Sequence, residues 1–392
     1  MQWTSAVSSE PDLDHALDAL ERELKPAFGN GPADLAVVFV SPHHQEDYRR
    51  IPAQVQQRFG PRVLIGCSAA GVIGGGREFE QQPALSLTLA SLPGVQLRPF
   101  QLIDRDLPDL DAGPQQWIDL IGAAPQPPVH FLLLADPATF DPRTLLMGLD
   151  FAYPGGAKIG GLASAPQGNA LFLGQATLDD GAVGLALGGN IAVDTVVAQG
   201  CRPIGQPMTI TRCEEHFLLE LDHRPAVEVL VELYHRLEPE DQELLNHGLQ
   251  LGIASSELQQ DFAHGDFLIR NVMRIGRDPD FIAIGDHLRQ GQTVQFHLRD
   301  ARTAAEDLAL MLQRYHTRPA STPLAGALLF TCTGRGQYLF ERPNHDSDMF
   351  RQQVGALPLA GFFCGGEIGQ VGAATYLHGY TSSFGIFRPL HA

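Results

Sequence analysis

The chain has 392 residues, a formal net charge of −18 and 44% hydrophobic residues. This length exceeds what one ordinary hydrophobic core accommodates, so we expect two or more domains. The negative charge excludes nucleic acid as a partner, because binding a phosphate backbone needs clustered lysine and arginine. The five cysteines have no paired spacing, which argues for a reducing compartment. Without a signal sequence or an apolar run of membrane length, we expect a cytoplasmic protein that does not bind membranes.

Helices and strands alternate in the predicted order of elements. Leucines recurring on one face predict a helix over 11–25, and the valine-rich residues 34–41 predict a strand covered on both faces. A helical stretch then leads to a second strand over 62–68. The same order returns at 129–164 and at 326–369, and each copy ends in a glycine-rich turn followed by an extended segment. We therefore predict an internal repeat of strand, helix, strand, glycine turn and hairpin.

A different pattern separates the second and third copies. Residues 225–239 are helical in pattern, and residues 268–300 alternate in the manner of antiparallel strands. Asp300 is well placed to cap a helix over 301–315. The predicted fold class is α/β, or mixed α+β, with repeated strand–helix–strand units and mixed sheets. The boundary between two closely packed domains is expected near 215–224.

The first glycine-rich turn follows the strand that ends in Cys67 and Ser68. Ser68 does not form a nucleophile elbow, because Ala70 occupies the position that needs glycine. No helix pattern follows the nearby glycines and no Walker motif occurs, so no nucleotide cofactor is expected. The small residues permit close approach of a neighbouring strand or of a ligand. Cys67 and Ser68 are accordingly candidate ligand-binding residues.

A second turn places Arg335 between two glycines at the end of an apolar strand. Cys332 precedes the turn and Gly336 closes it. A guanidinium next to bare backbone suits a carboxylate, which arginine binds through two parallel hydrogen bonds. The alternative is a tight turn whose arginine pairs with a carboxylate of the same fold.

The third turn contains Cys364, Gly366 and Glu367. Glu367 is the only carboxylate in a long apolar, glycine-rich stretch and therefore needs a partner. Arg335 is the obvious candidate, because both turns follow neighbouring parallel strands. Ligands of open α/β sheets bind outside the carboxyl ends of the strands. Such a pair would hold both poles of an amino acid, or would form an internal salt bridge without a ligand.

Three cysteines, Cys67, Cys332 and Cys364, each lie at such a strand end. A catalytic thiol needs a nearby base, for which His345 and His378 are available in the third copy. Cysteine is also among the residues most often buried, so a structural role is the alternative. No spacing typical of a metal site occurs, and no metal is expected. No catalytic residue is assigned.

These motifs resemble the FIST family, with its paired FIST-N and FIST-C domains. The resemblance implies a lead-in over 1–29, a FIST-N-like domain over 30–220 and a FIST-C-like domain over 221–392. Cys332, Arg335, Gly336, Gly366 and Glu367 match its strongest motifs. The segments that carry the resemblance are VLIGCSAAGVIGG, TCTGRGQYLF, LPLAGFFCGGEIG and YLHGYTSSFGIF.

The resemblance implies an intracellular sensory module that binds small ligands, with amino acids as the suggested class. Members of the family occur alone or fused to kinase and cyclase outputs, and a eukaryotic branch carries an F-box. Our first hypothesis is a non-catalytic sensor of an amino acid or small carboxylate that signals through a separate partner protein. The alternatives are a thiol-dependent hydrolase or transferase using Cys332 or Cys364, and a protein-interaction adaptor.

Overall fold

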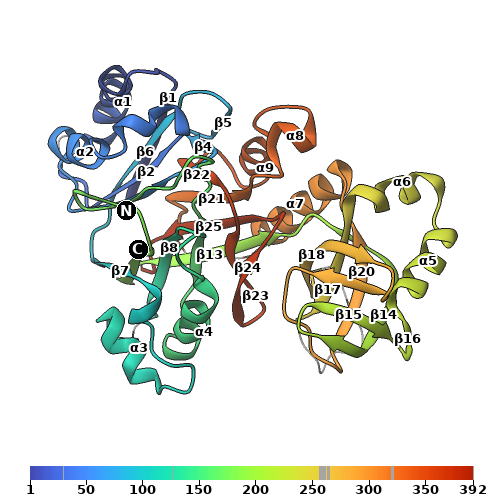
Figure 1. The fold of residues 1–392 in the computed structure, drawn as a ribbon. Helices are drawn as coiled ribbons and strands as arrows, with labels where there is room; N and C mark the ends of the chain where they lie inside the picture. Colours follow the sequence, from blue (N-terminus) through green and yellow to red (C-terminus); the bar gives the residue numbers. More distant parts are fainter. Residues whose placement is uncertain (30, 127, 256–261, 263–264, 319–321, 392) are drawn as a thin grey trace. The chain divides into compact units, whose positions relative to one another are not determined.

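The computed structural model describes residues 1–29, 31–126, 128–255, 262, 265–318 and 322–391. The chain forms two compact units: unit 1 comprises Met1–Val197 and Met311–Ala392, and unit 2 comprises Ala198–Leu310. Helices and mixed sheets occur together (Figure 1), so the predicted α/β class is confirmed. Unit 2 is inserted along the chain between two segments of unit 1.

Unit 1 contains three six-stranded sheets with one common strand order. We call the chain segments that build them repeat 1 (2–91), repeat 2 (95–189) and repeat 3 (192–198 with 301–388). Each repeat supplies an edge strand, a helix, a first central strand, a second helix, a second central strand, a hairpin and a returning strand. In all three the two central strands are parallel, and the returning strand is antiparallel to the first of them.

The bounds of the elements follow this order. Repeat 1 contains β1 (Gln2–Ser8), α1 (Leu13–Phe28), β2 (Leu35–Val40), the 3-10 helix η1 (Pro42–Asp47), α2 (Ile51–Phe59), β3 (Val63–Ser68), β4 (Gly71–Gly74), β5 (Arg77–Glu80) and β6 (Leu85–Ser91). Repeat 2 contains β7 (Val95–Leu102), η2 (Asp104–Asp106), α3 (Pro114–Ile121), β8 (His130–Ala135), α4 (Pro142–Ala152), β9 (Lys158–Leu162), β10 (Leu171–Leu173), β11 (Ala176–Leu178) and β12 (Ala182–Gly189). Repeat 3 contains β13 (Ala192–Ala198), α7 (Ala301–His316), β21 (Gly326–Cys332), α8 (Gly336–Phe340), α9 (His345–Gln353), β22 (Leu359–Cys364), β23 (Glu367–Val371), β24 (Ala374–His378) and β25 (Ser382–Arg388).

The hairpin of each repeat joins the sheet of another repeat. The β4–β5 hairpin of repeat 1 pairs with β22 of repeat 3, and the β10–β11 hairpin of repeat 2 pairs with β3 of repeat 1. The β23–β24 hairpin of repeat 3 completes the ring by pairing with β9 of repeat 2. Each sheet therefore depends on a neighbouring repeat for its last two strands.

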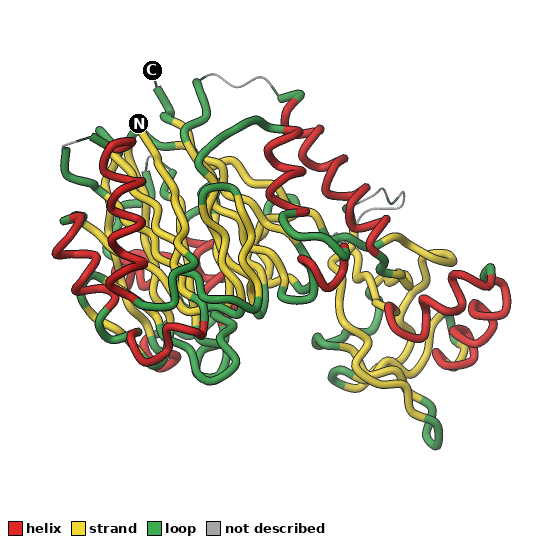
Figure 2. The backbone as a smooth tube through the Cα atoms, turned by 90° about the horizontal axis from the view of Figure 1, so that it is seen from above, coloured by secondary structure: helices red, strands yellow, loops and turns green. Residues whose placement is uncertain are grey.

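The inner faces of the three sheets share one apolar core, while the outer faces pack against helices. Phe39 of β2, Leu134 of β8 and Phe330 of β21 all belong to the inner core. On the outside, Leu17 and Leu24 of α1 lie in a separate core against repeat 1. Figure 2 shows the strands of unit 1 gathered between its helices. Burial on both faces explains why the central strands are continuous apolar runs.

One glycine in each second central strand lets its neighbour approach closely. A Cβ atom added at Gly66, Gly160 or Gly361 would lie 2.0, 1.8 or 1.7 Å from a carbonyl oxygen of the first central strand. Each oxygen belongs to the register partner of the glycine. No side chain fits at such distances without movement of the backbone, so the three positions require glycine in the same place of each repeat.

We predict that Gly66→Ala, Gly160→Ala and Gly361→Ala each lower the free energy of unfolding by about 3 kcal/mol or more, because the clash is with backbone. The control is Gly188→Ala in β12, where the nearest atom would be 3.8 Å from the new Cβ. Urea unfolding checks both. Equal effects of the control and the three test substitutions would contradict the packing described.

Unit 2 contains a sheet of its own, the helices α5 and α6, and the first part of α7. Its elements are β14 (Arg202–Glu214), β15 (Phe217–Leu221), β16 (Arg224–Pro225), α5 (Ala226–Arg236), α6 (Pro239–Gly248), β17 (Leu249–Ala254), β18 (Phe267–Gly276), β19 (Phe281–Ile284) and β20 (Thr293–Leu298). The predicted cap of α7 is present, since the amide of Thr303 donates to Asp300 Oδ1 at 2.7 Å. Within the described ranges, no helix has both the length and the apolar character needed to cross a bilayer.

Candidate functional site

The predicted site residues lie in unit 1, at the carboxyl ends of central strands. Cys332 ends β21 and Cys364 ends β22, and the two are register partners in this parallel pair. Cys67 and Ser68 end β3 of repeat 1 and are fully buried. The strand order thus brings the second and third turns of the sequence together at one edge of the repeat 3 sheet, as the parallel arrangement requires.

Arg335 is fully buried and holds a carboxylate of its own repeat. Its Nε and Nη2 atoms donate to Asp346 Oδ2 and Oδ1 at 2.9 and 3.0 Å. Its guanidinium also lies over the ring of Phe340, 5.2 Å from the centroid. The sequence interpretation paired Arg335 with Glu367, whereas the ion pair that the structure shows is with Asp346 in the first turn of α9. This edge of the guanidinium therefore fits the alternative interpretation of the turn, in which Arg335 pairs with a carboxylate of the same fold.

Asp346 accepts hydrogen bonds from three further side chains. Thr331 Oγ1 and His345 Nδ1 each donate to it at 2.8 Å, and the Ser382 hydroxyl is a third donor. Burial by itself would raise the pKa of Asp346, but the Arg335 charge and these hydrogen bonds outweigh it and hold the pKa well below its usual range. Asp346 is therefore ionised, and its charge is compensated inside the protein.

Glu367 belongs to the same region through the start of β25. The residue is fully buried, and its Oε2 accepts a hydrogen bond from the Thr381 amide at 3.1 Å. Thr381 also accepts a hydrogen bond from the Cys332 amide, and it directly precedes Ser382, which binds Asp346. The Arg335 and Glu367 motifs are thus connected through residues 381–382. We call the connected residues Thr331, Arg335, His345, Asp346, Glu367, Thr381 and Ser382 the buried polar network.

The turns around this network have unusual backbone conformations. Glu341 and Asn344, which flank the α8–α9 connection, have φ angles of 53° and 60°. Tyr380, next to Thr381, has a φ angle of 61°. Asn adopts the left-handed region readily, but Glu341 and Tyr380 are strained there, and such strain is concentrated at binding and catalytic sites.

A small surface lies above the network at the strand ends. Cys332 and Gly334 are partly exposed, and Thr333 and Gly365 are exposed. The Thr333 amide donates to the Cys364 carbonyl at 3.0 Å, which ties the two turns together. We call Cys332, Thr333, Gly334 and Gly365 the strand-end surface. Gly336 and Gly366, both predicted site residues, are buried beside it.

The buried thiols Cys67 and Cys364 are not activated, and the two candidate histidines make contacts within the fold. Burial raises the pKa of the Cys67 and Cys364 thiols well above the ordinary value, so neither is a thiolate near neutral pH. His345 donates to Asp346 and stacks on Phe340 with 3.4 Å between ring centroids. His378 Nε2 lies 3.1 Å from the Gly369 carbonyl oxygen. Across the described part of the chain, no group of three or more His, Cys, Asp or Glu residues is arranged to hold a metal ion.

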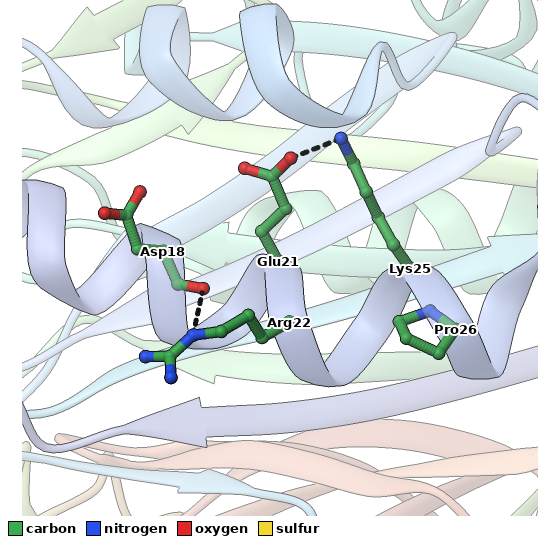
Figure 3. A pocket seen from close by; sticks show the side chains of 5 residues that line it. All are labelled: Asp18, Glu21, Arg22, Lys25 and Pro26. Atoms are coloured by element: carbon green, nitrogen blue, oxygen red, sulfur yellow. Dashed lines mark hydrogen bonds and ion pairs between the residues drawn. The ribbon is translucent and has the colours of Figure 1, made fainter.

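Two surface hollows lie elsewhere on unit 1. One of about 610 Å³ runs along α1, and all its lining residues come from that helix (Figure 3): Asp18, Glu21, Arg22, Lys25 and Pro26. Lys25 pairs with Glu21, Arg22 Nε donates to the backbone carbonyl of Asp18 at 3.2 Å, and the Asp18 carboxylate pairs with Arg58. The other, of about 390 Å³, lies between β1, the β4–β5 turn, α9 and residues 355–359. None of the predicted site residues lines either hollow.

Sequence reasoning missed Asp346, the residue on which the network converges. The signal was present, because Asp346 stands in the acidic first turn of a helix that closely follows the Arg335 turn. An acidic residue in a first turn is ordinarily read as a partner of the helix dipole, not of a buried arginine. Thr331 and Ser382 gave no signal, since small polar residues at strand ends are common.

We predict that Asp346→Asn lowers the free energy of unfolding by about 3–5 kcal/mol, because it leaves the buried Arg335 charge uncompensated. Asp348→Asn on the same helix is the matched control: its pairs with Arg351 and Arg342 are partly exposed, and its loss should cost less than about 1 kcal/mol. Urea unfolding of both variants measures the difference. Equal, small effects would show that the buried pair is not an essential constraint.

Comparison with known proteins identifies the family. The sequence model of the FIST N domain matches residues 34–224, and that of the FIST C domain matches residues 226–370. An uncharacterized protein of Mycobacterium tuberculosis is 36% identical over 388 residues, which cover 97% of this chain and 98% of the relative. An uncharacterized protein of Mycobacterium bovis is 34% identical over 401 residues, with 97% of each chain covered.

Two further similarities are more distant. An F-box/LRR-repeat protein of Arabidopsis thaliana is 30% identical over 122 residues, or 27% of this chain and 23% of the plant protein. A crystal structure of cyanuric acid hydrolase from A. caulinodans covers 99% of both chains at 9% identity, with a TM-score of 0.34. The two domain matches and the mycobacterial relatives show that the chain belongs to the FIST family.

Proposed function

We propose that this chain is a non-catalytic cytoplasmic sensor that binds an amino acid or another small carboxylate at the strand-end surface and signals through a separate partner protein. FIST domains are sensory domains of signal-transduction proteins, which gives the general role. The ligand class, the site and the partner are the parts that we propose.

The observation that carries the proposal is the burial of charge next to the strand-end surface: Arg335 follows Gly334 in the chain, and its amide donates to the Cys332 carbonyl at 2.9 Å. Arg335 and Asp346 are fully or almost fully buried, and Glu367 is buried next to them. Buried ion pairs contribute little to stability compared with apolar residues of the same volume, so their presence needs another reason. Strained turns surround these charges, and parallel strands end here, where α/β sheets bind ligands.

The structure changes the expected mode of binding. The Nε and Nη2 atoms of Arg335 already hold Asp346, so this edge is not available to clasp a ligand carboxylate. In the revised proposal the ligand lies on the strand-end surface, against the Thr333 side chain and Gly365. The backbone amides of Thr333, Gly334 and Gly365 already donate to the Cys364 carbonyl, Cys332 Sγ and the Leu162 carbonyl, so they are not the groups that hold it. Arg335 acts from below by holding the α8–α9 segment to β21.

The two alternative functions gain less support. A thiol-dependent hydrolase or transferase loses Cys364, whose raised pKa keeps it protonated, and is left with the partly exposed Cys332. An adaptor needs a partner surface, and among the residues that the structure describes no patch is distinguished for this role. The sensor is the function that the site supports best.

A thermal-shift screen over the common amino acids and small carboxylates tests this proposal. A ligand present at one hundred times its dissociation constant stabilises the folded protein by about 2.7 kcal/mol. Gly365→Leu is the test variant, because Gly365 is exposed and a new Cβ would meet only ordinary contacts, 3.5 Å or more away. Gly31→Leu is the control, since Gly31 is exposed with no atom within 4 Å of a new Cβ.

We expect at least one compound to stabilise the wild type and Gly31→Leu, but not Gly365→Leu, because the added side chain covers the strand-end surface. If no amino acid or carboxylate shifts the wild type, the ligand class is wrong. If Gly365→Leu responds as the control does, the site is elsewhere.

A further inference from the structure

The β4–β5 hairpin of repeat 1 reaches the two short helices that carry the Arg335–Asp346 pair. On β5, Glu80 Oε1 accepts a hydrogen bond from the Gln337 amide in the first turn of α8, at 2.9 Å. Glu78 Oε1 accepts one from the Ser347 amide in the first turn of α9, at 2.7 Å, and the Glu78 amide donates to Asn344 Oδ1 at 2.7 Å. Two carboxyl groups of one strand thus hold both helix starts.

These contacts frame the ion pair on both sides. Arg335 is the residue immediately before α8, and Asp346 is the residue immediately before Ser347. The hairpin comes from a different repeat, so it forms an external clamp on the segment 335–347. Gly336 fits this clamp closely, because a Cβ there would lie 2.5 Å from a Glu80 carboxyl oxygen. Movement of β5 would therefore release the segment that supports the strand-end surface.

Glu78 is an unusual group for a clamp. It is nine-tenths buried, and its second oxygen, Oε2, has no hydrogen-bond partner among the described residues. A buried carboxylate with one bare oxygen is far more costly than a neutral carboxylic acid in the same place. Burial raises the pKa of Glu78 to about 8, and the nearby Asp346 charge adds to the rise, while the hydrogen bonds from Ser347 oppose it.

The charged groups around Glu78 are consistent with a proton at this position. The elements packed most closely against β5 are β4, which has no titratable residue, α8, whose only titratable residue is Tyr338, and α9. The titratable residues of α9 are His345, Asp346, Asp348 and Arg351. Asp346 is neutralised by Arg335 and bound by His345, while Asp348 pairs with Arg351. On β5 itself, Glu80 is a further acid and Arg77 lies over Phe79.

We propose that Glu78 is a proton-dependent positioning residue: while it carries a proton the β4–β5 hairpin holds the 335–347 segment and the strand-end surface in place, and when it ionises the hold weakens. The functional role of this proton rests on the proposed ligand site. The contact between the hairpin and the 335–347 segment, and its dependence on the protonation of Glu78, are properties of the ligand-free protein. We call the conformation in which the hairpin holds the 335–347 segment the closed form. Ligand binding would then be coupled to proton uptake, because the closed form binds both the ligand and the proton.

The direction of the pH effect follows from proton linkage. Glu78 binds its proton more tightly in the closed form than when exposed, where its ordinary pKa of 4.5 applies. The hold is therefore complete below about pH 4.5 and is lost as the pH rises toward about 8. Across this window the opening equilibrium constant rises by up to about tenfold per pH unit for one proton. Asp346 stays ionised throughout, so it does not contribute to the change.

Hydrogen exchange of the ligand-free protein tests the proposal. The protection factor of a peptide over 336–350, corrected for the intrinsic exchange rate, should fall at least tenfold between about pH 6 and 8 in the wild type. In Glu78→Gln, which keeps the bond to the Ser347 amide but has no proton to lose, it should stay constant. A peptide from β12 is the internal control. The variant Asp348→Asn, which changes a partly exposed acid of α9, should follow the wild type.

A protection factor that does not change with pH in the wild type would overturn the proposal. The same fall in Glu78→Gln would also overturn it, because the proton would then belong to another group. Both outcomes are independent of the ligand screen, so this inference and the proposed function can fail separately. If both hold, the ligand-induced thermal shift should be smaller at pH 8 than at pH 6 in the wild type alone.

Discussion

The ion pair between Arg335 and Asp346 constrains everything around the strand ends of repeat 3. An isolated buried charge is too costly to keep, so the chain must bring the start of α9 onto the turn after β21. The Asp346 carboxylate also accepts hydrogen bonds from Thr331 and Ser382, which are register partners in β21 and β25. These hydrogen bonds fix the register of β25 beside β21. The strained turns at both ends of this segment are tolerated because the network over-determines them.

The exchange of hairpins explains why this local arrangement depends on distant sequence. Repeat 3 does not close its own site: the strand that holds α8 and α9 comes from residues 77–80, far away in the chain. Repeat 3 in turn sends its own hairpin to repeat 2. A change in one repeat can therefore reach its neighbour through two strands and their side-chain contacts.

Much of the fold follows from the sequence, because the central strands are continuous apolar runs and their glycines stand at equivalent places. The candidate site could be predicted from the sequence only in part. The turns at Cys332–Gly336 and Cys364–Glu367 were expected to meet, and parallel pairing brings them together. The partner of Arg335 was not expected, because choosing between Asp346 and Glu367 depends on which side chain the helix start presents. Strand β1 was missed, since its pairing with β6 is set by tertiary contacts and not by its own pattern. The clamp by Glu78 and Glu80 required the hairpin exchange, which no local signal indicates.

The central claim is that a small ligand binds above the buried polar network. It is tested most directly by amide chemical-shift mapping of the isotope-labelled protein, titrated with the compound that gives the largest thermal shift. The account predicts that the saturable changes are largest at Thr333, Gly334 and Gly365, with smaller changes in the first turns of α8 and α9. Changes confined to unit 2, or to the hollow along α1, would contradict it.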